Sequence, residues 1–275
     1  MRRLQLALFL LVAGAALGCH SFGAMSGSGA EPPGPQLRRI LESGVLRVGL
    51  SGNQPPLNMR NAEGELIGLE VDLVDALATS MGLETQLVTM PFAALLPALE
   101  AGEVDLVISG LTITPERNAR VAFAGPYFIS GKSVLAKEGT LASASPADLD
   151  LPDRTYVALE GSTSERFVNE WLTRAKLVTA PDYDTAIQRV LDGEVHALVA
   201  DYPICAFTVM RRPEAGLETF TTSFTIEPLG IAVRPGDPLF VNLLENYLQS
   251  LADTGILTNL RARWFSVGPW VEDLP

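Results

Sequence analysis

The segment Val104–Arg120 has the sequence VDLVISGLTITPERNAR, and it predicts a buried strand, a turn and the start of a helix. Val104–Ile108 is a short apolar run typical of a buried strand, and Ser109-Gly110 ends it. Thr114-Pro115 then predicts a helix start, because Thr is a common N-cap and Pro fits the first helical position. The segment therefore predicts a turn with free backbone N–H groups between a strand and a helix.

Arg117 falls in the first turn of this predicted helix. Free amides and the helix dipole favour an anion at a helix N-terminus. A guanidinium group can bind both oxygens of a carboxylate at once. The segment therefore predicts a carboxylate-binding site. A plainer interpretation, which the segment alone leaves open, is a solvated surface arginine on an ordinary strand-to-helix connection.

The N-terminus has the form of an export signal. Arg2-Arg3 precede an apolar run, Leu4–Leu17, that is too short to span a bilayer comfortably. Small residues directly before Cys19 resemble a bacterial lipobox, although Ala16 stands where Leu is usual. We expect residues 1–18 to be a lipoprotein signal peptide and Cys19 to be lipidated, with plain secretion as the alternative. Residues 19–36 are rich in Gly, Ser, Ala and Pro and predict a flexible tether to a membrane surface.

The composition excludes several classes of protein. The formal net charge is −12, and removal of Arg2-Arg3 takes it to −14, which argues against binding to nucleic acid or directly to anionic lipid. Cys19 and Cys205 are the only cysteines, so a lipidated Cys19 leaves no internal disulfide. Cys205 is most simply a buried small hydrophobe. We expect no metal site, because no Cys/His cluster is present, and no cofactor.

Strands and helices alternate along the rest of the chain. The predicted strands cover 46–50, 87–88, 155–159, 177–179, 196–200 and 230–233, and the predicted helices cover 69–81, 92–101, 164–171, 183–191, 238–252 and 257–264. This alternation predicts an α/β fold with mainly parallel sheets flanked by helices. The segments 121–137 and 220–227 are expected to be passages between two lobes.

Further polar residues follow predicted strands, where α/β sheets place their ligands. Ser51–Pro56 is a polar, proline-stiffened loop. Glu160–Ser164 is a second turn between a predicted strand and a predicted helix, so its free amides could also bind an anion. Gly161-Ser162-Thr163 by itself is weak evidence for such a site. Asp201 ends a strand and could pair with an ammonium group. It could equally, or also, be the N-cap of the next helix.

The chain resembles the extracellular solute-binding proteins of bacterial ABC transporters, in the family that binds polar amino acids. The most specific piece is Ile108–Arg117 (ISGLTITPER), followed by Phe123 and Gly125-Pro126-Tyr127. The supporting pieces are Gly64–Leu73, Leu96–Asp105, Gly161-Ser162-Thr163, Asp201 and Trp264-Phe265. The resemblance covers about Leu37–Phe265.

This resemblance implies a periplasmic-binding-protein type II fold, in which two α/β lobes close on a ligand about two hinge strands. Lobe 1 is then expected at 37–128 and 230–275, lobe 2 at 133–224, and the hinge crossings at 129–132 and 225–229. It also implies that Arg117 and the Thr112 amide bind the α-carboxylate of an amino acid, with help from Thr163 and the adjoining Ser162.

On the same resemblance, the Gly110 carbonyl and the Asp201 carboxylate bind the α-ammonium group. Phe92 matches an aromatic residue that packs on the ligand side chain, with simple burial as the alternative. Family members often have an acid at the position of Ser51 and an aromatic at that of Gln54, so the pocket here is expected to be more polar and less suited to basic side chains.

Glu70 lies close to the crevice in the resemblance, where it could contact a cation or an amide, or pair with Arg117. We therefore predict a binding protein for a polar amino acid or a close analogue. It is expected to be a non-enzymatic monomer that serves an ABC permease in the periplasm or at the cell surface. The alternatives are a cyclohexadienyl dehydratase-like enzyme with Glu160, Glu70 or Asp201 as general acid, and a soluble sensor of amino acids.

Overall fold

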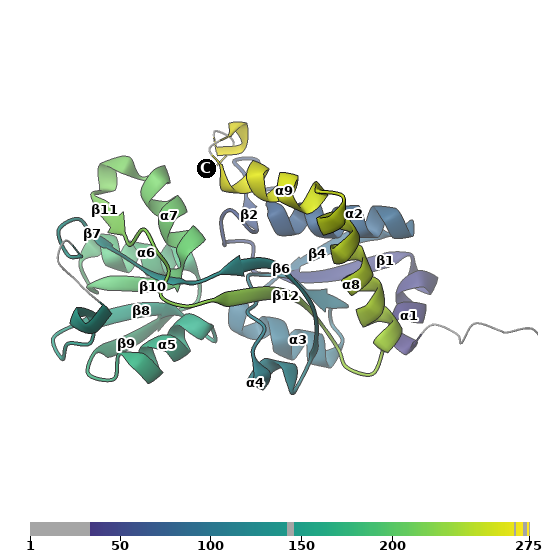
Figure 1. The fold of residues 1–275 in the computed structure, drawn as a ribbon, viewed down its shortest axis with the longest axis horizontal. Coiled ribbons are helices and arrows are strands. Elements are labelled where there is room, and N and C mark those ends of the chain that lie inside the picture. Colours follow the sequence, from purple (N-terminus) through teal and green to yellow (C-terminus); the bar gives the residue numbers. More distant parts are fainter. Residues whose placement is uncertain (1–33, 142–145, 267, 272–273, 275) are drawn as a thin grey trace, which may run out of the picture. The chain divides into compact units, whose positions relative to one another are not determined.

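The computed structural model describes residues 34–141, 146–266, 268–271 and 274, which belong to one compact unit (Figure 1). The predicted signal peptide, Cys19 and nearly all of the predicted tether lie outside the described residues. One tether boundary needs correction, because helix α1 (Pro35–Ser43) already begins at Pro35. No helix within these described ranges combines the length and apolar character needed to cross a bilayer.

The first sheet has five strands. Its order is β4 (Glu84–Thr89), β1 (Val45–Leu50), β5 (Leu106–Val107), β12 (Glu227–Val233) and β6 (Ala122–Ser130). Strands β4, β1 and β5 are parallel, whereas β12 is antiparallel to both β5 and β6. We call this sheet and its helices lobe 1.

The second sheet also has five strands. Its order is β11 (Leu217–Thr219), β7 (Lys132–Lys137), β10 (Ala197–Asp201), β8 (Thr155–Leu159) and β9 (Lys176–Ala180). Strands β10, β8 and β9 are parallel, whereas β7 is antiparallel to both β10 and β11. We call this sheet and its helices lobe 2.

Both sheets are therefore mixed, which corrects the expectation of mainly parallel sheets. The reason is the connection between them. Strand β6 ends at Ser130 and β7 begins at Lys132, so one nearly continuous segment enters both sheets (Figure 1). Strand β12 pairs with β6 in the opposite direction, from Glu227 beside Ser130 onward. Strand β12 thus runs against the parallel strands of the first sheet, and β7 runs against those of the second.

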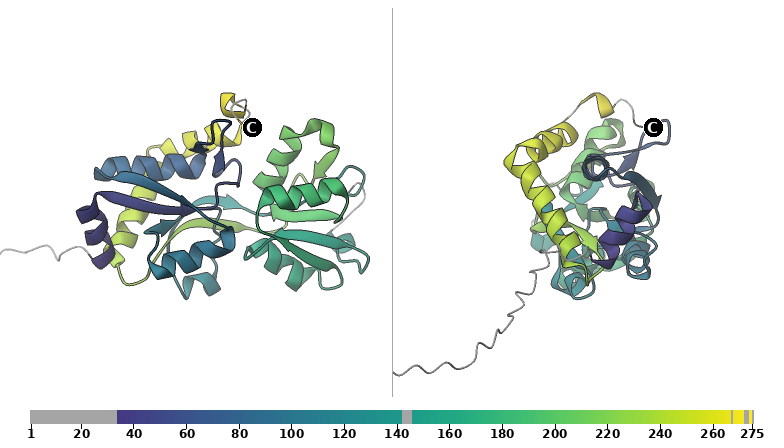
Figure 2. Two further views of the ribbon diagram at one scale, coloured as in Figure 1. Left: turned by 180° about the vertical axis from the view of Figure 1, so that it is seen from behind. Right: turned by 90° about the vertical axis from the view of Figure 1, so that its right-hand side faces the viewer.

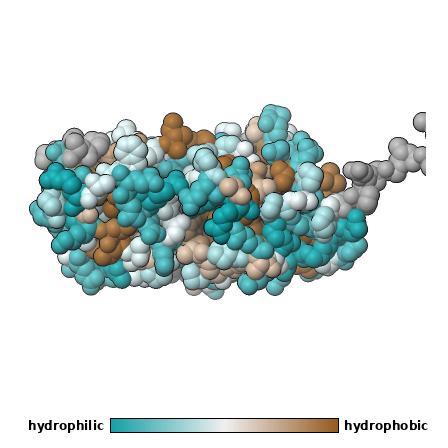
Figure 3. Space-filling model, turned by 90° about the horizontal axis from the view of Figure 1, so that it is seen from below, coloured by the Kyte–Doolittle hydropathy of each residue, from teal (hydrophilic) through white to brown (hydrophobic). Residues whose placement is uncertain are grey.

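Helices cover both faces of each sheet. In lobe 1, α2 (Leu69–Met81) and α9 (Ile256–Phe265) lie on one side of the sheet, and α3 (Leu95–Ala101) lies on the other (Figures 1 and 2). The remaining elements are α4 (Pro115–Asn118), α5 (Thr163–Trp171), α6 (Tyr183–Asp192), α7 (Tyr202–Arg211), α8 (Pro238–Asp253), the hairpin β2 (Met59–Arg60) and β3 (Leu66–Ile67), and 3₁₀ helices at Phe92–Ala94, Pro146–Leu149, Pro213–Ala215 and Pro269–Val271. The space-filling view in Figure 3 shows mostly hydrophilic side chains with small separate hydrophobic groups.

Most predicted helices and strands are present, with local corrections. The single helix predicted over 92–101 is a 3₁₀ turn followed by α3. Pro97 explains this, because it has no N–H to donate to the carbonyl four residues earlier. The strand predicted over Val104–Ile108 is assigned only at Leu106–Val107, although Asp105 and Ile108 still donate backbone hydrogen bonds to Arg47 and Gly49 of β1, at 2.8 and 3.1 Å.

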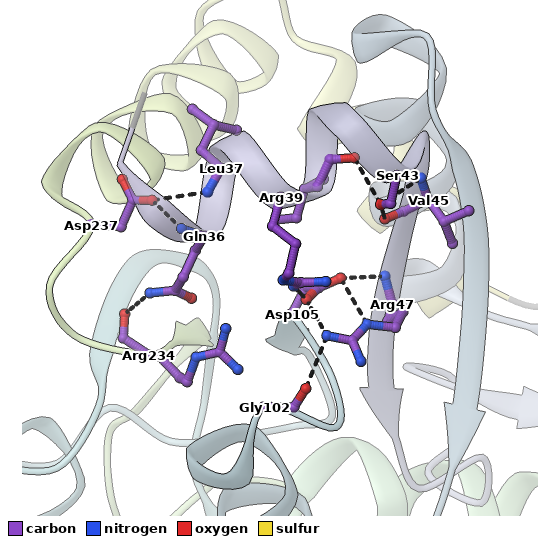
Figure 4. A network of polar contacts seen from close by, with 11 residues as sticks. Gln36, Leu37, Arg39, Ser43, Val45, Arg47, Gly102, Asp105, Arg234 and Asp237 are labelled. Carbon is purple, nitrogen blue, oxygen red and sulfur yellow. Dashed lines mark hydrogen bonds and ion pairs between the residues drawn. The ribbon is translucent and has the colours of Figure 1, made fainter. Parts of the chain in front are cut away.

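Two buried aspartates connect distant parts of lobe 1 (Figure 4). Asp237 caps α8 and also accepts from the backbone N–H groups of Gln36 and Leu37 in α1, at 3.0 and 2.9 Å. Asp105 is fully buried and accepts from the Arg47 backbone at 3.0 Å and from its guanidinium at 2.8 Å. Asp105 also forms an ion pair with Arg39 of α1. Because a buried carboxylate is costly without hydrogen-bond or charged partners, Asp237 fixes α1 against α8, and Asp105 fixes α1 and β1 against the start of β5.

Candidate functional site

The turn after β5 has the predicted geometry of a capped helix start. The Thr114 hydroxyl accepts a hydrogen bond from the Arg117 backbone N–H at 3.2 Å, so Thr114 is the N-cap of α4. Gly110 has a φ of +57°, a left-handed conformation that favours glycine. Its N–H donates to Glu70 Oε1 at 2.7 Å. The turn is therefore held at both ends by side-chain contacts.

The Arg117 guanidinium connects the two lobes. It donates to the Thr112 carbonyl at 3.0 Å in lobe 1 and to the Gly161 carbonyl at 3.0 Å in lobe 2. It also lies 5.8 Å from the centre of the Phe92 ring, within range of a cation–π contact. Burial lowers the pKa of Arg117 to about 10, so it is still a cation at neutral pH. The charge is bound here only to neutral carbonyls.

The second turn, after β8, has its own cap. The Ser162 hydroxyl accepts from the Glu165 backbone N–H at 3.2 Å, and Glu165 Oε2 accepts from the Gly161 N–H at 2.7 Å. This reciprocal pattern resembles a capping box. The Thr163 hydroxyl lies 3.2 Å from that of Thr112 in lobe 1. The two predicted anion-binding turns therefore face each other directly.

Asp201 lies at the end of β10 and at the N-cap position of α7, but its side chain makes no capping bond. Instead its carboxylate pairs with the ammonium group of Lys132, the first residue of β7. Lys132 Nζ also lies 3.7 Å from Glu227 Oε2 on β12. Glu227 in turn accepts from the Thr163 hydroxyl at 3.2 Å and from Thr225 at 2.9 Å.

Sequence reasoning missed Lys132 and Glu227. The available signals were weak: Lys132 precedes the otherwise small and apolar stretch Ser133–Ala136, and Glu227 ends the segment interpreted as a passage between lobes. Neither residue has an oppositely charged partner nearby in the sequence. Their pairing depends on β7 and β12 meeting beside Asp201, which no local pattern predicts.

Glu70 is 1% exposed and sits beneath the first turn. Its carboxylate accepts from Asn58, from the Gly110 N–H at 2.7 Å and from the Tyr127 hydroxyl. These three donors, rather than Arg117, are its partners. Burial raises the pKa of Glu70, and the hydrogen bonds oppose that shift. The residue joins the loop after β1, the turn after β5 and strand β6.

The predicted loop residues Ser51 and Gln54 form a neutral polar wall. The Gln54 side-chain amide donates to the Ser51 hydroxyl at 3.0 Å and to the Ser109 carbonyl at 3.2 Å. Asn58 Oδ1 accepts from the Gly52 N–H at 2.6 Å and so closes the loop. Gln54 is 3% exposed, so in this conformation its amide is satisfied within lobe 1.

A pocket of about 360 Å³ opens beside Arg117. Four of the predicted site residues line it: Phe92, Arg117, Ser162 and Thr163. The other six, Gly110, Thr112, Asp201, Ser51, Gln54 and Glu70, lie behind these residues or in the adjoining hydrogen-bond networks. The structure thus brings Phe92, Arg117, Ser162 and Thr163 together at one surface. Of the other six candidates, Ser51 is half-buried and the rest are buried.

Residues that could carry out other chemistry lie elsewhere. Cys205 is fully buried, as predicted, and burial raises the pKa of its thiol to about 12. The exposed His196 accepts a hydrogen bond from the Thr155 backbone at 3.0 Å. Glu160 is exposed to solvent. In the described part of the chain, no three His, Cys, Asp or Glu side chains are grouped as a metal site would require.

The chain is similar to a known family of bacterial binding proteins. Residues 46–267 match the model of the bacterial extracellular solute-binding proteins, family 3. The L-cystine-binding protein TcyJ of Escherichia coli is 28% identical over 229 residues, which are 83% of this chain and 85% of that protein. Cyclohexadienyl dehydratase of Pseudomonas aeruginosa is 27% identical over 234 residues, which are 83% of this chain and 85% of the enzyme.

A solved structure gives the same result for the fold. An ancestral amino acid-binding protein, described as a precursor of cyclohexadienyl dehydratase, superposes with a TM-score of 0.78 at 34% identity. The match covers 84% of this chain and 99% of that one. The two-lobed α/β fold predicted from the sequence is therefore confirmed.

Proposed function

The chain belongs to the bacterial extracellular solute-binding proteins, family 3, and we propose that it captures a polar amino acid, or a close analogue, between its two lobes for an ABC transporter. In this proposal the partner is a permease, and Cys19 carries a lipid that anchors the protein in the periplasm or at the cell surface. The proposed hinge crossings are residues 129–132 and 225–229, so closure changes the distance between the turns on either side of the pocket.

One observation carries the proposal: the Arg117 guanidinium lies between the two turns and is bound only to two neutral carbonyls. A ligand carboxylate would replace these contacts with shorter, charge-assisted hydrogen bonds. The adjacent Thr112 amide and Thr163 hydroxyl would provide further donors. Phe92 lies at the mouth of the same pocket, where it would pack against the ligand side chain.

The ammonium group of the ligand would lie on the other side of the turns. We propose that the Asp201 carboxylate and the Gly110 carbonyl bind this ammonium group. Asp201 is 6% exposed and already binds one ammonium group, that of Lys132. A carboxylate has two oxygens that accept in several directions, so Asp201 can serve a second cation.

We infer that the protein is a binder without catalytic activity, although one relative is a dehydratase. The three acids that could act as general acids are poorly placed for that role. Glu160 is exposed, Asp201 is ion-paired, and Glu70 is occupied by three donors beneath the turn. A general acid must be within hydrogen-bond reach of the substrate, and neither Glu160 nor Glu70 lines the pocket. The Asp201 carboxylate, paired with Lys132, is placed to accept hydrogen bonds from cations rather than to donate a proton.

A thermal-shift screen of the purified protein against the amino acids and related carboxylic acids tests the proposal. A ligand at about 100 times its Kd adds about 2.7 kcal/mol to the stability of the folded state, which corresponds to about 5–10 °C in Tm. Calorimetry should then give one ligand per protein molecule. Absence of any Tm shift across the screen would contradict the binding function, and turnover of prephenate or arogenate would replace it with an enzymatic one.

A further inference from the structure

Three charged side chains form a buried cluster next to the candidate ligand site: Lys132, Asp201 and Glu227. Their exposed fractions are 2%, 6% and 9%. Lys132 contacts both carboxylates, and it lies in one proposed hinge crossing while Glu227 lies in the other. We call these three residues the hinge cluster. An ordinary surface ion pair contributes little, but charges buried to this degree must be balanced.

The hinge cluster is joined to the proposed carboxylate site. Thr163 donates to Glu227 Oε2 at 3.2 Å and lies 3.2 Å from Thr112, whose carbonyl accepts from Arg117. The charges of Asp201 and Glu227 also act on the Arg117 guanidinium directly. Arg117 and Lys132 supply two positive charges, and Asp201 and Glu227 supply two negative ones. The hinge cluster and Arg117 therefore sum to zero.

This balance has a consequence for the ligand. A zwitterionic amino acid adds one carboxylate for Arg117 and one ammonium for Asp201, and so leaves the sum at zero. A ligand with a cationic or anionic side chain adds one unbalanced charge next to the buried hinge cluster. An unbalanced buried charge is costly. The nearby polar wall of Ser51, Gln54 and Ser109 has hydroxyl and amide groups, which suit an uncharged polar side chain.

We propose that Lys132 is a specificity-determining residue: its buried ammonium group balances Glu227 and so restricts the site to zwitterionic amino acids with uncharged side chains. This inference rests on the proposed amino acid-binding function and names the ligand class. Without Lys132, the same pocket would have a net negative charge and would favour a ligand with a cationic side chain.

Three variants and three probes test this charge balance. The variants are Lys132→Met, Glu227→Gln and the double variant with both changes. The probes are glutamine, its isostere glutamate and the longer arginine, because their side chains are neutral, anionic and cationic. Lys137→Met is the matched control, since Lys137 is on the same strand β7 but exposed. Calorimetry on the full-length protein gives the affinity ratio of each charged probe to glutamine.

The wild type should prefer glutamine to both charged probes. Lys132→Met should raise the arginine-to-glutamine ratio by about tenfold or more, which corresponds to about 1.4 kcal/mol. Glu227→Gln should raise the glutamate-to-glutamine ratio in the same way. The double variant restores the charge sum and should return both ratios close to those of the wild type. Lys137→Met should leave both ratios unchanged.

Other outcomes would overturn the inference. If Lys132 acts only in folding, its removal lowers the affinity for all three probes by the same factor and the ratios stay constant. If Lys132→Met does not fold, Glu227→Gln and the double variant still test the balance, and constant ratios in both would contradict it. If the wild type binds an amino acid with a charged side chain more tightly than any with an uncharged one, only this inference fails. If no amino acid shifts the Tm, the proposed function fails as well.

Discussion

Glu70 and Asp201 are buried carboxylates on opposite sides of the candidate site, and their surroundings differ. Glu70, in lobe 1, accepts only from neutral donors: an amide side chain, a backbone N–H and a phenol. Asp201, in lobe 2, pairs with a lysine that also contacts Glu227. Glu70 lies at the start of α2 and Asp201 at the end of β10. Only Asp201 belongs to a network of ion pairs.

The difference indicates two roles. Neutral hydrogen bonds from three separate segments bind Glu70 and fix the loops of lobe 1, and its carboxylate does not line the pocket. An ion pair can be shared, because an incoming ammonium group offers the same chemistry as Lys132. We therefore interpret Glu70 as a residue that positions the Gly110 turn, and Asp201 as a residue that responds to the ligand.

The largest expected effect comes from breaking the ion pair. Lys132→Met leaves Asp201 and Glu227 buried without a cation, and such a loss typically costs about 3–5 kcal/mol. Urea unfolding should show a lower free energy of unfolding by about this amount, with an unchanged m-value. Lys137→Met should change it by less than about 0.5 kcal/mol. Equal stability of the two variants would mean that the pair is not structurally important.

Removal of Arg117 should have the next largest effect. Arg117→Ala loses a desolvated charged contact, so we expect affinity for the amino acid ligand to fall about a hundredfold or more, which corresponds to about 2.7 kcal/mol. Calorimetry measures the loss. Arg60→Ala is the control, because Arg60 is exposed, does not line the pocket and donates to the Gly64 carbonyl at 2.7 Å. Unchanged affinity in Arg117→Ala would contradict the proposed site.

Asp201→Asn should change ligand selectivity, in addition to the stability that is lost with the buried Lys132 ion pair. We expect amino-acid affinity to fall about tenfold more than the affinity for the corresponding carboxylic acid without an amino group. The reason is that the asparagine side chain retains shape but has no charge for the α-ammonium. Competition calorimetry with the two ligands gives the comparison. Equal losses for both would show that Asp201 does not bind the ammonium group.

Glu70→Gln should have the smallest effect and a distinct pH dependence. One hydrogen bond, from Asn58, is expected to be lost, at about 1 kcal/mol. Because the folded-state pKa of Glu70 is raised, its protonated form is favoured in the folded protein. Its contribution to stability is therefore fully present below the unfolded pKa and is lost as pH rises through the folded value.

Urea unfolding of wild type and Glu70→Gln at pH 5 and pH 7 measures this contribution. The wild type should gain stability relative to the variant as the pH falls. A constant difference between the two proteins at both pH values would contradict a raised pKa. Ligand affinity per folded molecule should change less in Glu70→Gln than in Asp201→Asn, and the opposite order would reverse the roles assigned to the two acids.

The sequence by itself predicted the family, the two-lobed fold and most local elements. Thr114 as a helix N-cap is confirmed. Glycines in the left-handed conformation end α2, α3 and α6, at Gly82, Gly102 and Gly193. These features depend on hydrogen bonds within a few residues, so the neighbouring sequence is sufficient to determine them. The roles of the ten predicted site residues stay predictions.

Only the tertiary structure decided how the charges are arranged. Lys132 and Asp201 are 69 residues apart, and they meet because β7 pairs antiparallel with β10. Glu227 reaches them because β12 returns beside β6. The same long-range pairing made the sheets mixed and directed Glu70 to Tyr127 and Gly110 instead of Arg117. Which charges are buried and paired depends on which strands become neighbours. The local sequence around a residue does not determine that strand pairing.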